Sequence, residues 1–343
     1  MTTREHEITE AIDLCDVDGL HLNPAARGWS RSLLHRANLA GRWGRTKRWD
    51  YWAIQSEELV VAVTIADIDY LGLVTVDWLE PATHRMGGRS AMVPLGRGIE
   101  LPDDPATGRL EYSSRNLGVS IDYGDNATDL SAHWIEKNGA NASLSVSVAA
   151  PLGHESLNVV IPWSETQFQF TSKHQARPAT GSVTLGDRTI DFGGSAGEAW
   201  GILDIGRGRW PYQTQWNWGG GAGHTTSGEV VGVQIGGKWT DNTGFTENGI
   251  LIDGRLLKIG EELEWLYDWD QPLEPWQVRS QDLTLDLMLT PLHDRHVNTN
   301  LGVLTNEVHQ VFGHWTGTVP DGDGSVLRVE QILGFAEEAR ARW

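Results

Sequence analysis

The sequence predicts an all-β protein, because many short runs of alternating apolar residues are separated by glycine- and proline-rich turns. Strong helical periods do not alternate with these runs, which argues against a parallel sheet with crossover helices. Dipeptides that favour tight hairpins lie between several runs: Asn138-Gly139, Gly186-Asp187 and Asp253-Gly254. We therefore expect β-barrel or sandwich halves with only short helical segments.

The first half of the chain is expected to hold an N-terminal arm followed by strands. The arm, residues 1–40, is acidic and has a weak helical tendency only near its end, at 31–38. Strands are predicted within residues 49–69, 116–123, 130–136 and 143–149. Asp67 and Asp69 would lie on one face of the first of these strands, an arrangement that suits a proton-handling pair but is more typical of a strand end in solvent, which we favour. Residues 81–107 hold four prolines and are expected to form loops.

The second half is predicted to be a further β domain after a junction near Pro151. This division gives an arm (1–40), a first β domain (41–150) and a second β domain (151–343). Strands are expected around the two later hairpins and within residues 157–171, 283–289 and 308–313. In the strand that begins at 157, the side chains that share one face are Phe168, Phe170, Ser172 and His174. Residues 321–324 are expected to turn, and 329–343 to combine a strand start with a short charged helix.

Composition restricts the class of partner. The 27 basic and 46 acidic residues give a net charge of −19, which disfavours binding to nucleic acids and anionic lipid surfaces. No apolar run is long enough for a membrane span, and the acidic N-terminus does not resemble a secretory signal. Cys15 is the single cysteine, which suits a reducing compartment. We therefore expect a cytoplasmic protein, while its oligomeric state stays open.

Residues 200–254 combine tryptophan with glycine more densely than any other stretch. Aromatic walls, close backbone approach and a few polar groups are what a pocket for a partly apolar ligand requires. For any single tryptophan, a purely structural role in the core is an equally good interpretation. The predicted ligand-binding residues are Trp210, Tyr212, Trp216, Asn217, Trp218 and Trp239, together with His174, His309 and Arg207.

Three acids in or near this segment are candidate proton donors, namely Asp204, Asp241 and Glu247. A carboxyl group beside an indole ring loses hydration, which raises its pKa and suits a general acid. The alternative for each acid is a plain polar role at a turn. Of Arg207 and Arg209, we expect at most one to face the pocket and the other to form a surface ion pair.

Other motifs give no support for a cofactor or metal. The glycine run at residues 219–223 lacks the Gly-Lys-Ser/Thr ending and the helix of a phosphate loop. Asp321 and Asp323 resemble the start of a calcium loop, but the required glycine and glutamate are missing. His293 and His296 have a spacing that binds metal on a helix, whereas Pro291 favours a loop here. We therefore expect no metal and no cofactor.

Several long runs resemble a family called domain of unknown function 2804. They are SLNVVIPW, FTSKHQARPATGSV, LDIGRGRWPYQTQWNWGGG, VGVQIGGKWTDNTGFTENGILIDGRLLKI and VHQVFGHWTG, with LNPAARGWSRSLLHRANL and RWDYWAI near the start. This resemblance spans nearly the whole chain and implies no particular activity. The all-β pattern around Trp216-Asn217-Trp218 is also similar to two-part lipocalin-like (calycin-like) proteins, which include carotenoid hydratases, tocopherol cyclases and cofactor-independent fungal cyclases. That similarity implies two β halves with a ligand in a barrel or between the halves.

These observations favour a protein that binds a largely hydrophobic small molecule, of isoprenoid, polyketide or lipid-like character. Acid-catalysed hydration, isomerisation or cyclisation is the activity that the candidate acids would support. In that case the indole faces would lie against developing positive charge. Two alternatives stay open: a non-catalytic lipid- or pigment-binding protein, and a carbohydrate-binding or glycan-cleaving β protein. Whether the protein is an enzyme is not decided by the sequence.

Overall fold

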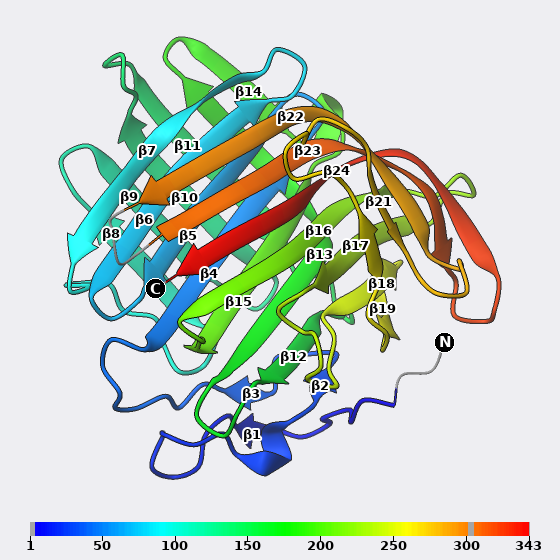
Figure 1. Ribbon diagram of the computed structural model, residues 1–343. Coiled ribbons are helices and arrows are strands. Elements are labelled where there is room, and N and C mark those ends of the chain that lie inside the picture. The colour runs from blue at the N-terminus through cyan, green and yellow to red at the C-terminus, as the bar shows by residue number, and fades with distance from the viewer. Residues whose placement is uncertain (1–3, 301–304, 343) are drawn as a thin grey trace.

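The protein is built from two large sheets and a short N-terminal arm (Figure 1). The computed structural model describes residues 4–300 and 305–342. In these residues the only helices are two single-turn 3-10 helices, η1 (Pro24–Ala26) and η2 (Gly194–Ala196). The all-β class predicted from the sequence is therefore confirmed, with two curled sheets as its halves.

The first sheet contains thirteen strands within the described residues. Its main path runs, in order, through β7 (Arg85–Pro94), β6 (Leu71–Glu80), β5 (Val60–Asp67), β4 (Thr46–Gln55), β15 (Trp200–Arg209), β13 (Phe168–Leu185), β11 (Asn141–Ala149), β10 (Ala127–Ile135), β9 (Leu117–Tyr123) and β8 (Gly108–Ser113). Beside this path, β12 (Leu157–Pro162) pairs with β13 and with β2 (Trp29–Ser30), and β14 (Arg188–Phe192) pairs with β13. In the arm, β1 (Ile12–Asp13) pairs in parallel with β3 (His35–Arg36).

The second sheet contains nine strands within the same residues. Its order is β19 (Arg255–Ile259), β18 (Asn248–Ile252), β17 (Val230–Gly237), β16 (Gln213–His224), β24 (Val326–Arg342), β23 (Thr305–Pro320), β22 (Asp286–Asn300), β21 (Trp276–Arg279) and β20 (Glu264–Leu266). The chain passes from the first sheet to the second between β15 and β16. Strands β12 to β15 thus lie in the first sheet, although they follow the junction predicted near Pro151; the division into domains stays a prediction.

Alternating burial explains why these segments form strands. In β10, every second side chain from Thr128 to Trp134 is buried, and the side chains between them face solvent. This period of two is the pattern of a strand with one face against a core. The predicted hairpins are confirmed as well, because the Gly186 and Asp253 turns join β13 to β14 and β18 to β19. Asn138 and Gly139 lie in the turn between β10 and β11.

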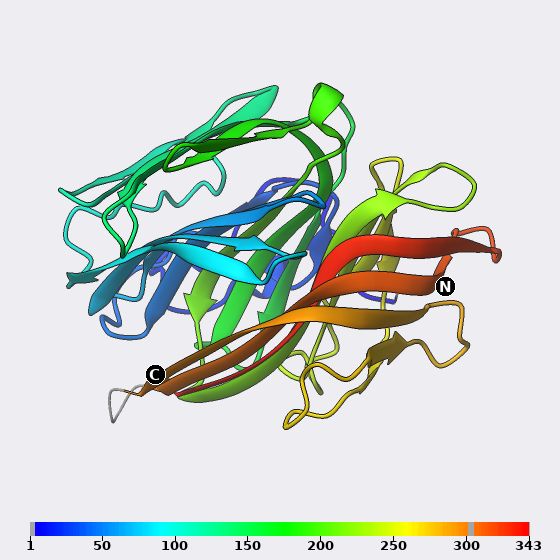
Figure 2. The ribbon, with the colours of Figure 1, turned by 90° about the horizontal axis from the view of Figure 1, so that it is seen from above.

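The two curled sheets lie against each other (Figure 2). A shared apolar layer fills the space between them. Its buried members come from both sheets: Ala53, Val60, Leu79 and Ile202 from the first, and Trp218, Phe312, Leu333 and Phe335 from the second. Each sheet also encloses a core of its own. Side chains on the facing sides of β13, β15, β16 and β24 are therefore held between two layers of structure.

Four local predictions were wrong. Residues 329–343 were expected to include a helix, but β24 continues to Arg342 because it pairs with both β16 and β23. Such pairing overrides the helical propensity of its alanine and glutamate residues. Residues 31–38 contain β3 instead of a helix, and the proline-rich region 81–107 contains β7. The expected loop at Pro291 lies inside β22, where a register shift between Pro291 and His293 accommodates the proline.

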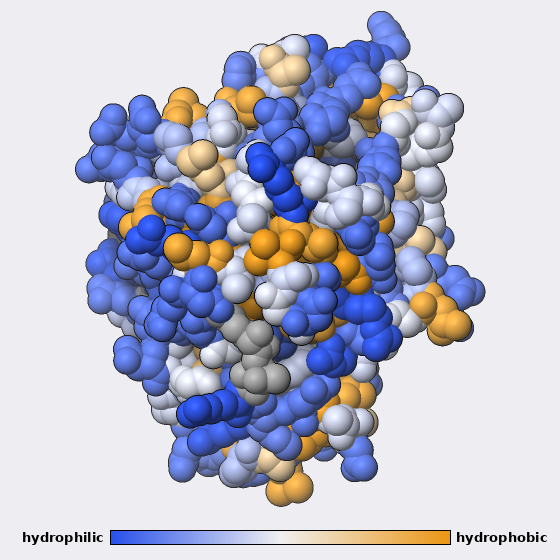
Figure 3. Space-filling view, turned by 90° about the vertical axis from the view of Figure 1, so that its right-hand side faces the viewer, coloured by the Kyte–Doolittle hydropathy of each residue, from blue (hydrophilic) through white to orange (hydrophobic). Residues whose placement is uncertain are grey.

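The face of the molecule in Figure 3, on the right-hand side of the view in Figure 1, is mostly hydrophilic. One group of apolar residues lies near its centre, and smaller apolar spots are scattered toward its edges. No helix among the described residues has the length and apolar character needed to cross a membrane.

Candidate functional site between the two sheets

The site begins with the two faces of β13. Phe168 and Phe170 pack against the N-terminal arm, on the face predicted from the sequence. The opposite face points toward the second sheet and carries the buried polar side chains Gln169, Thr171, Lys173 and Gln175. A strand that is buried on both faces normally carries apolar residues on both. Polar side chains here must therefore find partners within the protein.

Lys173 is the centre of this polar face. Its Nζ lies 3.0 Å from Oδ1 of Asp204 and 3.5 Å from Oε2 of Glu247. The ammonium group also lies 4.1 Å from the centre of the Trp218 ring, which is a cation–π arrangement. Burial opposes the charge on Lys173, but the neighbouring carboxylates outweigh burial and raise its pKa.

Three carboxyl groups around Lys173 each accept a hydrogen bond from an indole. Trp49 Nε1 donates to Asp204 at 3.0 Å, and Trp216 Nε1 donates to Glu337 at 2.8 Å. The third donor is Trp239, whose Nε1 donates to Glu247. We call this group the indole–carboxyl cluster; it consists of Lys173, Asp204, Glu247, Glu337, Trp49, Trp216, Trp218 and Trp239.

Two of the carboxyl groups have a raised pKa. Burial raises the pKa of Glu247 to about 7, against the opposing effect of Lys173. Burial likewise raises the pKa of Glu337 to about 7, although Trp216 and Lys173 favour its charged form. Carboxylic acids with a pKa near neutrality can donate a proton at physiological pH and accept it again. The cluster is thus chemically suited to proton transfer.

Glycines on β15 and β17 make room for the cluster. A Cβ atom at Gly206 would lie 2.1 Å from the Trp49 ring. A Cβ atom at Gly236 would lie 2.1 Å from Oε1 of Glu247. Both distances are far below any real carbon contact, so a side chain at either position would displace a member of the cluster.

Trp210 joins the cluster to a wider group of tryptophans. Its ring stacks on Trp239 with centroids 5.3 Å apart and an interplanar angle of 13°. It also contacts Trp49, Trp163 and Trp216, and its Nε1 donates to Gln169 at 2.8 Å. Trp210 and Trp218 are each only 6% exposed, whereas Trp49, Trp163 and Trp216 are half-buried. The half-buried rings form the edge of this aromatic group toward solvent.

The structure brings part of the predicted site together. Asp204, Glu247 and the tryptophans Trp210, Trp216, Trp218 and Trp239 meet in this region. Asp241, in contrast, is exposed in the turn after Trp239. Tyr212 is 46% exposed between β15 and β16.

The remaining predicted residues lie on other faces. Asn217 points away from the first sheet and donates to Tyr267 and to the main-chain oxygen of Glu337, at 3.0 and 3.1 Å. His174 contacts Ser172 on the arm side of β13, and burial lowers its pKa well below the usual value. His309 contacts His296 and Asp294 on β22 and β23 of the second sheet.

The expectation for the two arginines was wrong. Arg207 and Arg209 are two positions apart, so their side chains leave β15 on the same face, opposite that of Asp204. Both are buried: Arg207 pairs with Asp50 at 2.7 Å, and Arg209 donates to main-chain oxygens of the arm. Neither forms a surface ion pair.

Sequence reasoning missed Lys173, Glu337 and Trp49. The only signal for Lys173 is its place in a predicted strand, on the face opposite Phe168 and Phe170, and a lysine on such a face is typical of a solvent-facing side. Glu337 carried none, since its segment has a helical composition. Trp49 was assigned to a strand, but only the pairing of β4 with β15 places its ring over Gly206.

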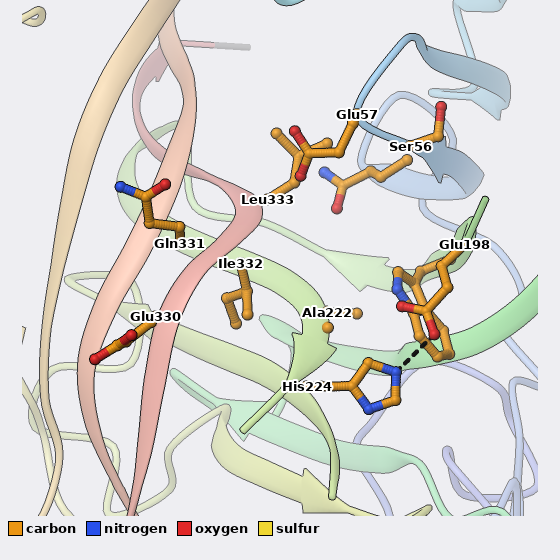
Figure 4. Close-up of a pocket in the computed structure, with 12 residues that line it drawn as sticks. Ser56, Glu57, Glu198, Ala222, His224, Glu330, Gln331, Ile332 and Leu333 are labelled. Carbon is orange, nitrogen blue, oxygen red and sulfur yellow. Dashed lines mark hydrogen bonds and ion pairs between the residues drawn. The ribbon is translucent and has the colours of Figure 1, made fainter. Parts of the chain in front are cut away.

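Two hollows lie outside the cluster. One, of about 360 Å³, opens between the sheets where Glu198 and His224 form a hydrogen bond of 2.7 Å (Figure 4). That bond with Glu198 raises the pKa of His224. The other hollow, of about 860 Å³, lies beside Trp78 and Glu136 on the first sheet. Neither is lined by a tryptophan of the indole–carboxyl cluster.

Fold and site together define an all-β protein of two curled sheets with a buried ionisable cluster between them. The chain belongs to the family described as domain of unknown function (DUF2804), whose model matches residues 5–343. No curated protein matches the sequence significantly.

Solved structures with a similar arrangement include CghA, with 11% identity over 98% of this chain and 94% of that chain and a TM-score of 0.50. A putative AttH from Nitrosomonas europaea has 12% identity over 86% of this chain and 92% of that one, with a TM-score of 0.47. Kievitone hydratase from Nectria haematococca has 12% identity over 88% and 89% of the two chains, with a TM-score of 0.45. At this level of identity, the likeness to CghA is one of fold.

Proposed function

We propose that the protein binds a largely apolar small molecule against its tryptophans and acts on it by acid catalysis. The observation that carries the proposal is the pair of carboxyl groups, Glu247 and Glu337, whose pKa values both lie at about 7 beside indole rings. A nearly dry, aromatic environment excludes bulk water from a reactive cation. Isoprenoid and polyketide-like molecules have the matching chemistry, since they carry double bonds and hydroxyl groups on apolar skeletons.

The proposed step begins with transfer of the carboxyl proton to an alkene carbon or to a hydroxyl group of the substrate. The first route gives a carbocation directly, and the second gives one after water leaves. Indole faces stabilise positive charge, so the tryptophans would favour this transition state. The carboxylate then recovers a proton, either from the substrate carbon skeleton or from an added water molecule. Isomerisation, hydration and ring closure are three outcomes of the same cation.

Glu337 is the stronger candidate for the first proton donor. Its indole partner, Trp216, is half-buried at the edge of the aromatic group, whereas Glu247 is 1% exposed and bonded to the buried Trp239. A substrate arriving from solvent would meet Trp216 first. Lys173 and Asp204 would act as positioning residues, because Asp204 holds the Lys173 cation, whose charge favours the ionised form of both acids.

Rotation of a rim indole is the movement that ligand entry requires. Trp49, Trp163 and Trp216 are the half-buried rings of the group, and the two hollows open elsewhere. An exposed ring edge can change rotamer without breaking the apolar layer behind it. Binding would therefore alter the fluorescence of these tryptophans.

Two measurements test the proposal. Native mass spectrometry of protein purified from its host should detect a retained apolar molecule. Incubation with an organic extract of the host, followed by liquid chromatography and mass spectrometry, should show conversion by the wild type. Glu337→Gln and Glu247→Gln should retain the molecule and lose at least tenfold in conversion, since a general acid contributes about 10²–10⁴-fold.

Asp241→Asn is the matched control, because Asp241 is exposed in a nearby turn. It should convert the extract like the wild type. Unchanged conversion in both glutamine variants would remove acid catalysis by these residues. A retained molecule without conversion by the wild type would favour the non-catalytic lipid- or pigment-binding alternative.

A further inference from the structure

Four ionisable side chains gather on one face of β22 and β23, away from the indole–carboxyl cluster. His296 pairs directly with His309 across the two antiparallel strands. Asp294 and Glu307 each lie two positions before one of these histidines, so all four side chains leave the sheet on the same side. His309 is also in register with Glu338 of β24, whereas Glu337 points to the opposite side, toward the first sheet.

The two imidazoles are held close together. Their rings stack in parallel, with centroids 4.1 Å apart and an interplanar angle of 2°. His296 Nε2 lies 3.1 Å from Oε1 of Glu307. One ligand atom from each of His296, Glu307 and His309 lies within 4.8 Å of the others.

The hydrogen bond to Asp294 fixes which nitrogen is available on His309. Asp294 Oδ2 lies 2.7 Å from Nδ1. A carboxylate only accepts, so the tautomer that satisfies this contact has the proton on Nδ1 and the lone pair on Nε2. The His309 ring also makes a T-shaped contact with Trp269, with ring centroids 4.4 Å apart and an interplanar angle of 88°. A buried carboxylate behind a histidine is the usual support of a metal-binding imidazole, because it sets the tautomer and the ring orientation.

We propose that His296, Glu307 and His309 bind a zinc ion, with Asp294 as a positioning residue for His309. Two imidazoles and one carboxylate suit zinc, whereas calcium and magnesium prefer oxygen ligands alone. Zinc–ligand bonds of about 2.0–2.2 Å place the ligand atoms of a tetrahedral site roughly 3.4 Å apart. His296 Nε2 and Glu307 Oε1, at 3.1 Å, already meet this spacing. The other separations, which are within 4.8 Å, need to shorten by no more than about 1.4 Å. His296 and Glu307 have the freedom to do so, since their side chains are 43% and 38% exposed.

Three protein ligands leave a fourth position of the zinc open for water or another small ligand. Spacing along the sequence did not indicate this site. Along the chain, the histidine near His296 is His293, whereas His309 lies in a separate predicted strand. The pairing of β22 with β23 is what brings the second imidazole to the first.

Zinc titration of untagged protein, dialysed against a chelator beforehand, tests the site. Competition with a chromophoric zinc chelator should give one bound equivalent, and Co²⁺ should give the visible absorption of a four-coordinate nitrogen–oxygen site. His296→Ala and Glu307→Gln should weaken zinc binding at least tenfold. Asp294→Asn should weaken it about 10- to 100-fold, as expected for a group that supports a metal ligand.

His314→Ala is the matched control, because His314 lies on the same strand and also faces a glutamate, Glu57, at 3.2 Å, without a second imidazole. It should bind zinc like the wild type. Absence of stoichiometric binding by the wild type overturns the proposal, and so does an equal loss in His314→Ala and His296→Ala. Glu337→Gln should bind zinc normally, so this test is independent of the proposed acid catalysis.

Discussion

Glu337 and Glu338 are consecutive on β24 and have opposite pKa shifts, because their side chains leave the strand on opposite faces. Glu337 faces the first sheet, where burial raises its pKa to about 7. Glu338 faces the other way; burial again opposes its charge, but hydrogen bonds from Tyr267, Arg340, Lys238 and Gln215 outweigh it and lower the pKa. One strand therefore separates a carboxyl group that can hold a proton at neutral pH from one that stays ionised.

The shifted pKa values predict how stability depends on pH. A carboxyl group with a pKa of about 7 in the folded protein, against 4.5 normally, holds a proton that the unfolded chain releases. The free energy of unfolding should therefore fall as the pH rises from about 4.5 through 7. Each such group accounts for about 3 kcal/mol, at 1.36 kcal/mol per pH unit. Glu337→Gln lacks one of these groups, so urea denaturation should show the stability of the wild type relative to this variant falling by about 3 kcal/mol as the pH rises across this range. A difference that is constant with pH would contradict the raised pKa.

Removing the central cation should destabilise the protein strongly. Lys173→Met keeps the apolar length of the side chain but leaves Asp204 and Glu247 without their cation. Breaking a buried ion pair in this way costs about 3–5 kcal/mol. Urea denaturation at pH 7 measures the loss. The control is Lys137→Met, at an exposed position, which should change the free energy of unfolding by less than about 0.5 kcal/mol. In the double variant with Glu247→Gln, the loss in free energy of unfolding should be smaller than the sum of the two single losses. The reason is that one of the two carboxylates left without a cation is then neutral.

The sequence predicted the fold more completely than the site. Hairpin dipeptides and alternating burial act between residues that are close along the chain, so they can be read without a structure. Alternation along the strand is what places Phe168 and Phe170 on the same face of β13. The opposite face, with Lys173, looked like an ordinary solvent-facing side, because nothing in the local pattern shows that a second sheet covers it.

Long-range pairing explains the other omissions. Asp204 and Glu247 are candidate proton donors because each lies near tryptophan and glycine in the sequence. The sequence does not indicate that both contact Lys173. Glu337 lies in a segment rich in alanine, glutamate and arginine, whose propensity is helical. Only pairing with β16 and β23 makes this segment a strand and turns Glu337 toward Trp216. Sites assembled between sheets depend on contacts of this kind.

The indole donor should tune the acid that it contacts. Trp216→Phe keeps an aromatic ring but removes the N–H that donates to Glu337 at 2.8 Å. The charged carboxylate then loses a hydrogen bond, so the pKa of Glu337 should rise further above 7, by about one pH unit. Titration of ¹³C-labelled glutamate carboxyl groups by NMR measures the shift. Trp43→Phe, at a ring that is 69% exposed, should leave the titration unchanged. An unaltered midpoint in Trp216→Phe would mean that the hydrogen bond does not stabilise the carboxylate.

Arg207 is expected to act on stability rather than on ligand binding. Its guanidinium lies 2.7 Å from Asp50, and both side chains are almost fully buried, at 0% and 1% exposure. Tyr123 also donates to Asp50, at 2.6 Å. Arg207→Met should therefore cost about 3–5 kcal/mol, because it leaves a buried carboxylate without its cation. Combining it with Asp50→Asn should recover part of this loss, which a double-mutant cycle by urea denaturation measures. Retention of the apolar molecule, followed by native mass spectrometry, should not change in the double variant, since Arg207 lies on the face of β15 opposite Asp204. Loss of the molecule in a stably folded double variant would return Arg207 to the binding site.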